Sequence, residues 1–143
     1  MAWPPIEALV PHRAPMLLID RVASVEGATM TCELTVRAGA MFVDAGAVPA
    51  AVFVEYMAQT AAAHEGLSSM RGSPRAGRLL GVREAVFDVD RALVGEVLTV
   101  KATRDWDDGE SALYLGEVRG ADGRRYASAR FHVHRADVKE TER

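Results

Sequence analysis

The residue with the clearest chemical potential is a carboxylate in a helix made mostly of small side chains. Glu55 lies in the run 52–66, VFVEYMAQTAAAHEG, whose alanines would let a helix sit close to a sheet. Burying a carboxylate on the first turns of such a helix is costly without a partner. We therefore expect Glu55 to act as an acid or base, to be paired, or to stay in water near the positive end of the helix dipole.

The four histidines are the candidate bases that could work with this carboxylate. His12 lies in a proline-rich entry to the first predicted strand, where it could serve a site or hydrogen-bond the backbone and shape an entrance. His64 follows Glu55 by nine residues, which places it on roughly the opposite helix face and favours packing or a subunit contact. His132 and His134 share one face of a strand. No third ligand is suitably spaced, so we expect a half-exposed strand face and no metal.

Composition excludes several classes of protein. The chain has 143 residues, 49% hydrophobic and 26% charged, which suits one soluble domain. It has no apolar stretch long enough to span a membrane, and its N-terminus lacks the pattern of a signal peptide. A net charge of −3 gives no basic footprint for nucleic acid. A lone cysteine, Cys32, suits the reducing cytoplasm and is expected to be buried apolar filler.

Two strands and one long helix are predicted in the first half of the chain. The continuous apolar run 16–22 indicates a buried strand, and the alternating run 29–36 a second one, joined by a turn at Glu26-Gly27. Pro49 fits the first turn of a helix, which we expect over roughly 50–69. Gly66 is a possible stop for this helix and Gly72 a second one.

Four further strands are predicted after the helix, over 79–87, 96–106, 111–119 and 124–134. Segments 38–48 and 88–95 are expected to be loops, and Asp107-Asp108-Gly109 is typical of a hairpin turn. Runs of strands with one segregated helix favour an α+β layer fold. We expect one domain over 1–136, a charged tail over 137–143, and an exposed sheet edge that a second copy would cover.

Three segments of the chain resemble a known family of enzymes. LVPHRAPMLLIDRV (9–22), PAAVFVEYMAQ (49–59), and the pair LGVREAVF (80–87) and VGEVL (94–98) resemble, in order and spacing, motifs of 3-hydroxyacyl-acyl carrier protein dehydratases of the FabZ type. The patterns PHxxPMxLxDR and EYMAQxxAAHxG look closer still to the ApeP-like hotdog dehydratases of aryl polyene clusters. The resemblance covers about residues 6 to 135.

The resemblance implies a hotdog fold, in which an antiparallel sheet wraps around one central helix, and dehydration of a 3-hydroxyacyl thioester on an acyl carrier protein. It implies that Glu55 is the catalytic acid in an apolar tunnel, and that Gln59, one turn later on the same face, orients it or holds the helix. The N–H groups of Ala50 and Ala51 would hold the thioester oxygen. Further substrate-binding positions are Pro11, Arg13 and Pro49. No cofactor is expected, since no phosphate-binding loop, nucleophile elbow or zinc pattern is present.

One departure from the FabZ pattern concerns the catalytic base. FabZ enzymes carry it as the histidine of a Gly-His-Phe-Pro motif before the helix, which would fall near Met41 here. Segment 40–48 has the sequence AMFVDAGAV and contains no histidine. His12 is the candidate base in its place, although the matching histidine of FabZ relatives faces the tunnel and is not the assigned base.

Three functions remain open from the sequence. The first is the dehydratase, as a homodimer or as half of a heterodimer with another hotdog protein. The second is an acyl-CoA thioesterase on the same fold, in which the helix carboxylate activates water. The third is a degenerate partner subunit that lends Glu55 to a histidine of another subunit. The arginines of the loop after the helix could contact a phosphopantetheine phosphate or an acidic carrier, or be solvated loop charge; they are Arg71, Arg75 and Arg78.

Overall fold

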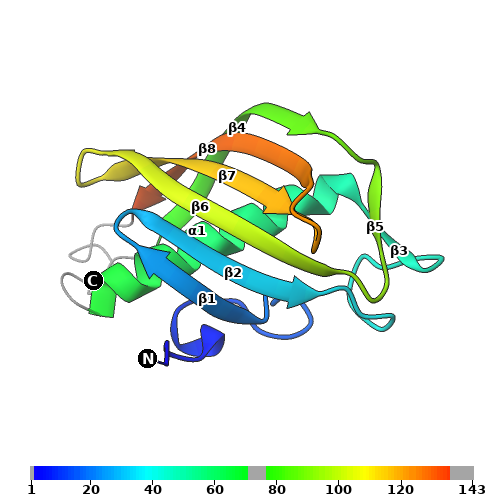
Figure 1. Cartoon of the computed structure of the whole chain (residues 1–143). Helices are drawn as coiled ribbons and strands as arrows, with labels where there is room; N and C mark the ends of the chain where they lie inside the picture. The colour runs from blue at the N-terminus through cyan, green and yellow to red at the C-terminus, as the bar shows by residue number, and fades with distance from the viewer. Residues whose placement is uncertain (1, 71–76, 136–143) are drawn as a thin grey trace.

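An antiparallel sheet curves around one long helix in the computed structural model, which describes residues 2–70 and 77–135 (Figure 1). In spatial order, the six strands of the main sheet are β1 (Arg21–Glu26), β2 (Thr29–Thr35), β6 (Val97–Asp107), β7 (Ser111–Arg119), β8 (Arg125–Arg135) and β4 (Gly77–Phe87). The central helix is α1 (Phe53–Met70). This is the predicted α+β hotdog fold.

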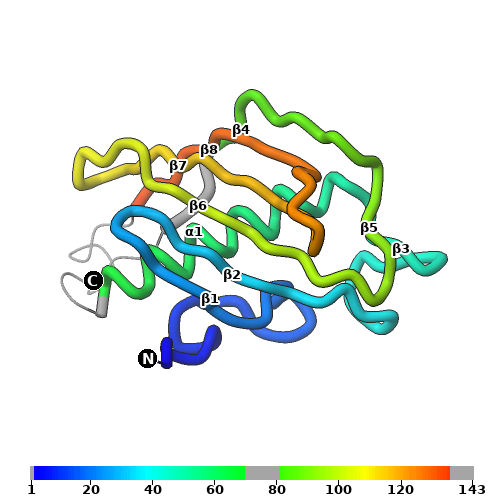
Figure 2. Tube along the Cα trace, in the orientation of Figure 1, coloured from blue at the N-terminus to red at the C-terminus, as the bar shows by residue number. Residues whose placement is uncertain are grey.

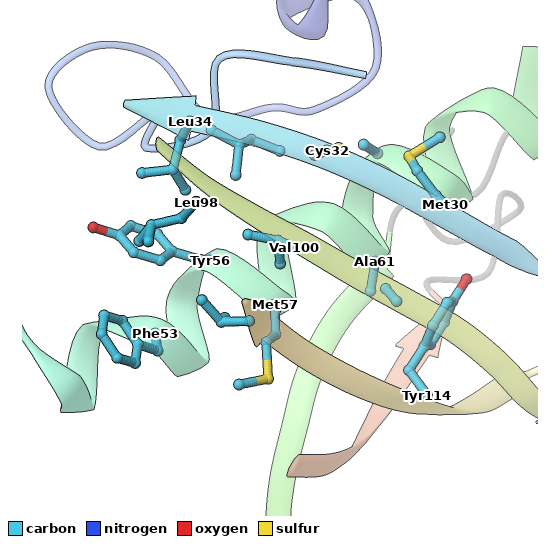
Figure 3. Close-up of a cluster of buried hydrophobic side chains, with 14 of the residues drawn as sticks. Met30, Cys32, Leu34, Phe53, Tyr56, Met57, Ala61, Leu98, Val100 and Tyr114 are labelled. Atoms are coloured by element: carbon cyan, nitrogen blue, oxygen red, sulfur yellow. The ribbon is translucent and has the colours of Figure 1, made fainter. Parts of the chain in front are cut away.

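The helix packs against the concave face of the sheet through residues spaced three and four apart, as one face of a helix requires. Phe53, Met57 and Ala61 have no exposed surface. From the sheet, the alternating residues of β2 and β6 meet them, as the period of two predicts for inward-facing positions. Figure 3 shows Met30, Cys32, Leu34, Leu98 and Val100 lying over the helix side chains.

The helix begins where Pro49 predicts but does not end at Gly66. Its first turn is a 3₁₀ turn, η2 (Ala50–Val52), and α1 then continues to Met70. The predicted helix over roughly 50–69 is thus confirmed to within one residue, and of its two possible stops Gly66 is not used, because this glycine serves a close contact. A Cβ built on Gly66 would lie 1.9 Å from the Leu9 carbonyl oxygen, so the N-terminal segment crosses the helix at a point where only hydrogen fits. Gly72 lies outside the described residues.

The first predicted strand is wrong over most of its length. Residues 16–20 do not belong to a strand, and β1 starts only at Arg21. The Asp20 N–H still bonds the Glu33 carbonyl of β2 at 2.9 Å, but the backbone of Met16 and Leu18 bonds the side chain of Gln59 in α1. A short 3₁₀ turn, η1 (Ile6–Ala8), precedes this segment, which runs beside β1 in blue (Figure 2).

The remaining strands match the sequence predictions to within about two residues, and one small sheet was not predicted. Two short strands, β3 (Ala47–Pro49) and β5 (Arg91–Leu93), pair within the segments expected to be loops. They are too short for a periodic signal. Their pairing fixes the chain immediately before the helix. The predicted charged tail, 137–143, lies outside the described residues.

A buried polar cluster closes the C-terminal half of the helix. The Arg135 guanidinium donates to both carboxylate oxygens of Glu65 and to Asp107, and the Tyr114 hydroxyl donates to Glu65 Oε2 at 2.7 Å. His64, 4% exposed, lies 2.7 Å from the same hydroxyl through Nδ1. The packing role expected for His64 is therefore confirmed. Burial raises the pKa of Glu65, but the bonds from Arg135 and Tyr114 outweigh it and leave this pKa below its ordinary value.

Acid is expected to destabilise this end of the fold through Asp107. The hydrogen bond from Arg135 lowers the pKa of Asp107 from 3.8 to about 2. Because the folded-state pKa is depressed, the stabilisation is present above the ordinary pKa and is lost as the pH falls from 3.8 towards about 2. We expect the free energy of unfolding, measured by urea denaturation, to fall across this window, and to fall less in Asp107→Asn.

Asp105→Asn is the matched control for this titration, because Asp105 is exposed on the same strand, two residues earlier. An Asp107→Asn protein whose stability has the wild-type pH dependence would contradict the prediction.

The outer strand β4 leaves one edge of the main sheet open. Residues 81–87 are all exposed, including Val82 at 39%, Val86 at 45% and Phe87 at 43%. An edge strand with exposed apolar side chains is a surface that usually meets another chain. Within residues 2–70 and 77–135, no helix has both the length and the apolar character needed to cross a membrane.

Candidate active site

Glu55 and Gln59 form the centre of the candidate site, one turn apart on α1. The Gln59 amide nitrogen donates to Glu55 Oε1 at 3.1 Å, as the i, i+4 spacing allows. Gln59 has no exposed surface, whereas the Glu55 side chain is 34% exposed. The apolar tunnel expected around Glu55 is therefore not formed by the single chain, and the carboxylate opens towards solvent.

Gln59 also ties the helix to the N-terminal segment. Its Nε2 donates to the Met16 carbonyl at 2.7 Å, and its Oε1 accepts from the Leu18 N–H at 2.8 Å. A buried amide that is fully engaged in this way specifies one arrangement of the two segments. One side chain thus contacts both Glu55 and the N-terminal segment.

His12 meets Glu55 across this junction. Its Nε2 lies 3.8 Å from Glu55 Oε1, and its side chain is 27% exposed. Its Nδ1 is buried and has no hydrogen-bond partner among the described residues. A histidine base usually has its second nitrogen held by an acceptor, so Nδ1 is the incomplete part of this arrangement.

No other histidine contacts Glu55. His64 is committed to Tyr114 near the far end of the helix. His132 and His134 are half-buried on β8, as expected for a strand face. Segment 40–48 supplies Met41, half-buried, where the FabZ histidine would fall. Among the described residues there is no group of three metal-ligating side chains.

The helix start differs from the prediction at Ala50. The Ala50 N–H donates to the Asp90 carbonyl at 2.9 Å, which removes it from the candidate donors for a substrate oxygen. The bond follows from the pairing of β3 with β5, which brings Asp90 alongside the first turn. Ala51 is exposed, and an open cavity of about 550 Å³ is lined by Pro49, Ala50, Ala51 and residues 87–90.

Pro11 and Arg13, which flank His12, were predicted substrate-binding residues, and their described contacts are with the local backbone or solvent and not with Glu55. The Arg13 guanidinium donates to the carbonyls of Val10 and His12, at 2.9 Å and 2.7 Å, and so braces the local backbone. Pro11 is exposed. In the loop after the helix, Arg71 and Arg75 lie outside the described residues, and Arg78 is described only as part of the backbone of β4.

Substitution of Gln59 tests whether its hydrogen bonds hold the N-terminal segment and Glu55 together. Gln59→Leu removes its hydrogen bonds and leaves the Met16 carbonyl and the Leu18 N–H without partners. We expect the free energy of unfolding to fall by about 2 kcal/mol. Turnover is expected to fall as well, because His12 and Glu55 are no longer held together. Chemical denaturation and steady-state kinetics measure the two effects.

Thr60→Val is the matched control for Gln59→Leu. Thr60 is equally buried on the same helix, but its hydroxyl bonds the Tyr56 carbonyl of the helix itself, at 2.9 Å, and the Cys32 side chain of β2, and neither belongs to the N-terminal segment. If Thr60→Val lowered turnover as much as Gln59→Leu, the prediction that Gln59 holds His12 and Glu55 together would be wrong.

Tyr56 is the residue of this region that the sequence did not bring forward. It follows Glu55 directly, is 4% exposed, and lines a cavity of about 300 Å³ between the N-terminal segment and residues 34–43. The sequence feature that could have identified Tyr56 is its large side chain, since it is the only tyrosine in the alanine-rich run 52–66. Tyrosines of that kind are usually core residues, so periodicity alone gave no reason to single it out.

Comparison with known proteins agrees with this architecture. The model of the ApeP-like family, described as ApeP dehydratase, matches residues 4–142. A chain of the dehydratase heterocomplex ApeI:P from Xenorhabdus doucetiae has a TM-score of 0.86 at 24% identity, over 98% of this chain and 96% of that chain. The search of curated proteins gives no match.

Other solved structures, one of them a thioesterase, share the fold at lower similarity. A Haemophilus influenzae thioesterase has a TM-score of 0.67 at 11% identity, covering 82% of this chain and 78% of that chain. The Escherichia coli PaaI protein of the phenylacetic acid degradation operon has a TM-score of 0.65 at 15% identity, covering 80% and 81%. At these identities the structures show a common fold alone. The family model spans almost the whole chain, and this protein therefore belongs to the ApeP-like dehydratase family.

Proposed function

We propose that this protein removes water from a 3-hydroxyacyl thioester, carried on the phosphopantetheine arm of an acyl carrier protein, to give the trans-2-enoyl thioester. The observation that carries the proposal is the 3.8 Å approach of His12 Nε2 to Glu55 Oε1. Membership of a dehydratase family supports the reaction class. The carrier-bound substrate is inferred from the motif resemblance.

The two side chains supply the two proton transfers that dehydration needs. His12 Nε2 takes the α-proton, and the C–H electrons form the new double bond. Glu55, in its protonated form, gives its proton to the departing hydroxyl, which leaves as water. The site then holds an imidazolium beside a carboxylate, and transfer of the proton from His12 to Glu55 restores the starting state.

The thioester oxygen gains negative charge during removal of the α-proton and needs a hydrogen-bond donor. The Ala51 N–H is our candidate, because the first N–H groups of a helix have no partner within it. Ala51 lies one turn before Glu55 and borders the open cavity at the helix start. A thioester placed there would have its oxygen near Ala51 and its hydroxyl towards Glu55.

A second hotdog subunit is the proposed partner of strand β4. Exposed Val82, Val86 and Phe87 make the strand costly to leave in water. The ApeI:P complex is itself a heterocomplex, which supports a different hotdog protein as the partner.

A second candidate function is a helper subunit without its own base. The unpartnered Nδ1 of His12 and the absence of a histidine in segment 40–48 favour it. In that case, Glu55 would work with a histidine of the partner. His12 would then only shape the entrance.

The test is turnover of a 3-hydroxyacyl-carrier protein by the purified chain, alone and with a second hotdog subunit. Loss of one water from the acyl group, followed by mass spectrometry, is the expected product signal. Activity of the chain alone supports His12 as the base, whereas activity only in the mixture supports the helper subunit. Release of free thiol without enoyl product would instead make the protein a thioesterase.

A further inference from the structure

Segment 11–15, which carries His12, makes few hydrogen bonds. Its two prolines have no backbone N–H, and within the described residues every hydrogen bond of the segment involves Arg13. The Arg13 guanidinium donates from Nη1 to the carbonyls of Val10 and His12, at 2.9 Å and 2.7 Å. The Arg13 carbonyl accepts from the Met16 N–H at 2.9 Å. The hydrogen bonding of this segment therefore depends on one residue.

The imidazole of His12 is itself held by no hydrogen bond from the described residues. Its Nδ1 is buried without a partner, and its Nε2 lies 3.8 Å from Glu55 Oε1, which is longer than a hydrogen bond. A catalytic base needs a defined position, since a displacement of about 1 Å can lower a rate about a hundredfold. The position of this ring is set by packing and by the backbone that carries it.

The Arg13 guanidinium has no acidic partner that would explain its direction. The residue is exposed, and no carboxylate of the described residues forms an ion pair with it. Folding a long side chain back onto its own backbone costs rotamer freedom, which the two hydrogen bonds must offset. A terminal guanidinium nitrogen suits this arrangement, because it carries two hydrogens and can donate to two carbonyls at once. The bond to Val10 is half-buried, where water competes less.

The hydrogen bonds continue from this turn to the central helix. The Met16 N–H bonds Arg13, and the Met16 carbonyl accepts from Gln59 Nε2 at 2.7 Å. The same nitrogen donates to Glu55 Oε1 at 3.1 Å. One continuous path of hydrogen bonds therefore joins the backbone of His12 to the carboxylate of Glu55. Arg13 supports one end of this path, and Gln59 supports the other.

We propose that Arg13 is a positioning residue, which keeps the His12 imidazole beside Glu55 by holding the backbone of residues 10–13. The inference rests on the proposed function, in which this pair carries out the proton transfers. It replaces the substrate-binding role that the sequence predicts for Arg13. Loss of a group that only binds substrate raises KM, whereas loss of a group that positions the base lowers kcat.

Arg13→Met tests this role, because methionine keeps an unbranched side chain and donates no hydrogen bond. We expect kcat to fall about tenfold to a hundredfold, with KM within about twofold of wild type. Arg21→Met is the matched control, since it removes another exposed arginine, whose partner Glu33 lies on β2, and it should keep the wild-type kcat. The kinetics use the full chain together with any second hotdog subunit that turnover requires.

A second measurement does not depend on turnover. The nuclear Overhauser effect between the His12 ring protons and the Glu55 side chain reports how close the two groups lie. We expect this effect in wild type and in Arg21→Met, and we expect it to lose most of its intensity in Arg13→Met. Circular dichroism and urea denaturation should show an unchanged fold, because the Arg13 side chain is exposed and bonds only the local backbone.

The outcomes separate this proposal from the proposed function. The positioning role is wrong if the Overhauser effect is absent from wild type or fully kept in Arg13→Met. It is also wrong if Arg13→Met raises KM at unchanged kcat, which would make Arg13 a substrate-binding residue. Loss of the Overhauser effect with unchanged turnover would keep the positioning role and remove His12 from the reaction. A wild-type chain that shows the effect but forms no enoyl product in any mixture would refute only the dehydratase.

Discussion

Glu55→Gln is expected to lower kcat by about a hundredfold to ten-thousandfold, the range that a positioned acid contributes. Glutamine keeps the size of the side chain but cannot give a proton to the departing hydroxyl. The fold should be unaffected, because Glu55 is one-third exposed and its contacts are a 3.1 Å hydrogen bond from Gln59 and the approach of His12. Steady-state kinetics on a 3-hydroxyacyl-carrier protein, with circular dichroism for the fold, is the measurement.

His12→Ala separates the two candidate functions of this site. If His12 is the base, its loss should lower kcat as strongly as loss of Glu55, and the two changes together should cost little more than either alone. If His12 only shapes the entrance, the effect should fall mainly on KM. Glu7→Gln and His132→Ala, at positions away from the pair, are matched controls. Wild-type turnover by Glu55→Gln would remove Glu55 from the mechanism.

Gly66→Ala is expected to cost about 4 kcal/mol or more of unfolding free energy, an exceptional value for adding one methyl group. Helix propensity alone predicts the opposite sign, since alanine is better than glycine by about 1 kcal/mol in a helix interior. Packing decides the outcome. The new Cβ would lie 1.9 Å from the Leu9 carbonyl oxygen and 2.7 Å from its carbon. Both are backbone atoms that no rotamer change can move.

The same substitution should also reduce turnover, because relief of the clash requires the N-terminal segment to leave the helix. His12 lies three residues beyond Leu9 and would move with it. Gly39→Ala is the control for the stability effect, since nothing lies within 4 Å of a Cβ there. Urea denaturation gives both values. A Gly66→Ala protein as stable as wild type would contradict the close crossing at Leu9.

Local pattern alone predicted most of the elements. Alternation identified β2 and β6, the Asp107-Asp108-Gly109 turn located the hairpin between β6 and β7, and Pro49 located the start of the helix. These features depend on residues that are neighbours in the chain, so periodicity and turn chemistry carry them. The motifs also identified the family, because their order and spacing are themselves properties of the sequence.

The predictions that failed depend on contacts between residues far apart in the chain. Segment 16–20 has the apolar composition of a buried strand, yet Gln59, 41 residues after Leu18, takes the hydrogen bonds that a neighbouring strand would have made. Gly66 resembles a helix stop, yet it is needed for the crossing of Leu9. Ala50 has the position of an oxyanion donor, yet the carbonyl of Asp90, brought there by β3 and β5, occupies its N–H.

The amino-acid sequence by itself therefore determined the α+β hotdog fold, the family and the two residues proposed for proton transfer. Only the tertiary structure decided which groups meet: His12 with Glu55, and Gln59 with residues 16–18. The physical reason is that periodicity encodes which face of an element is buried. It does not encode which polar atom from a distant segment arrives at that face.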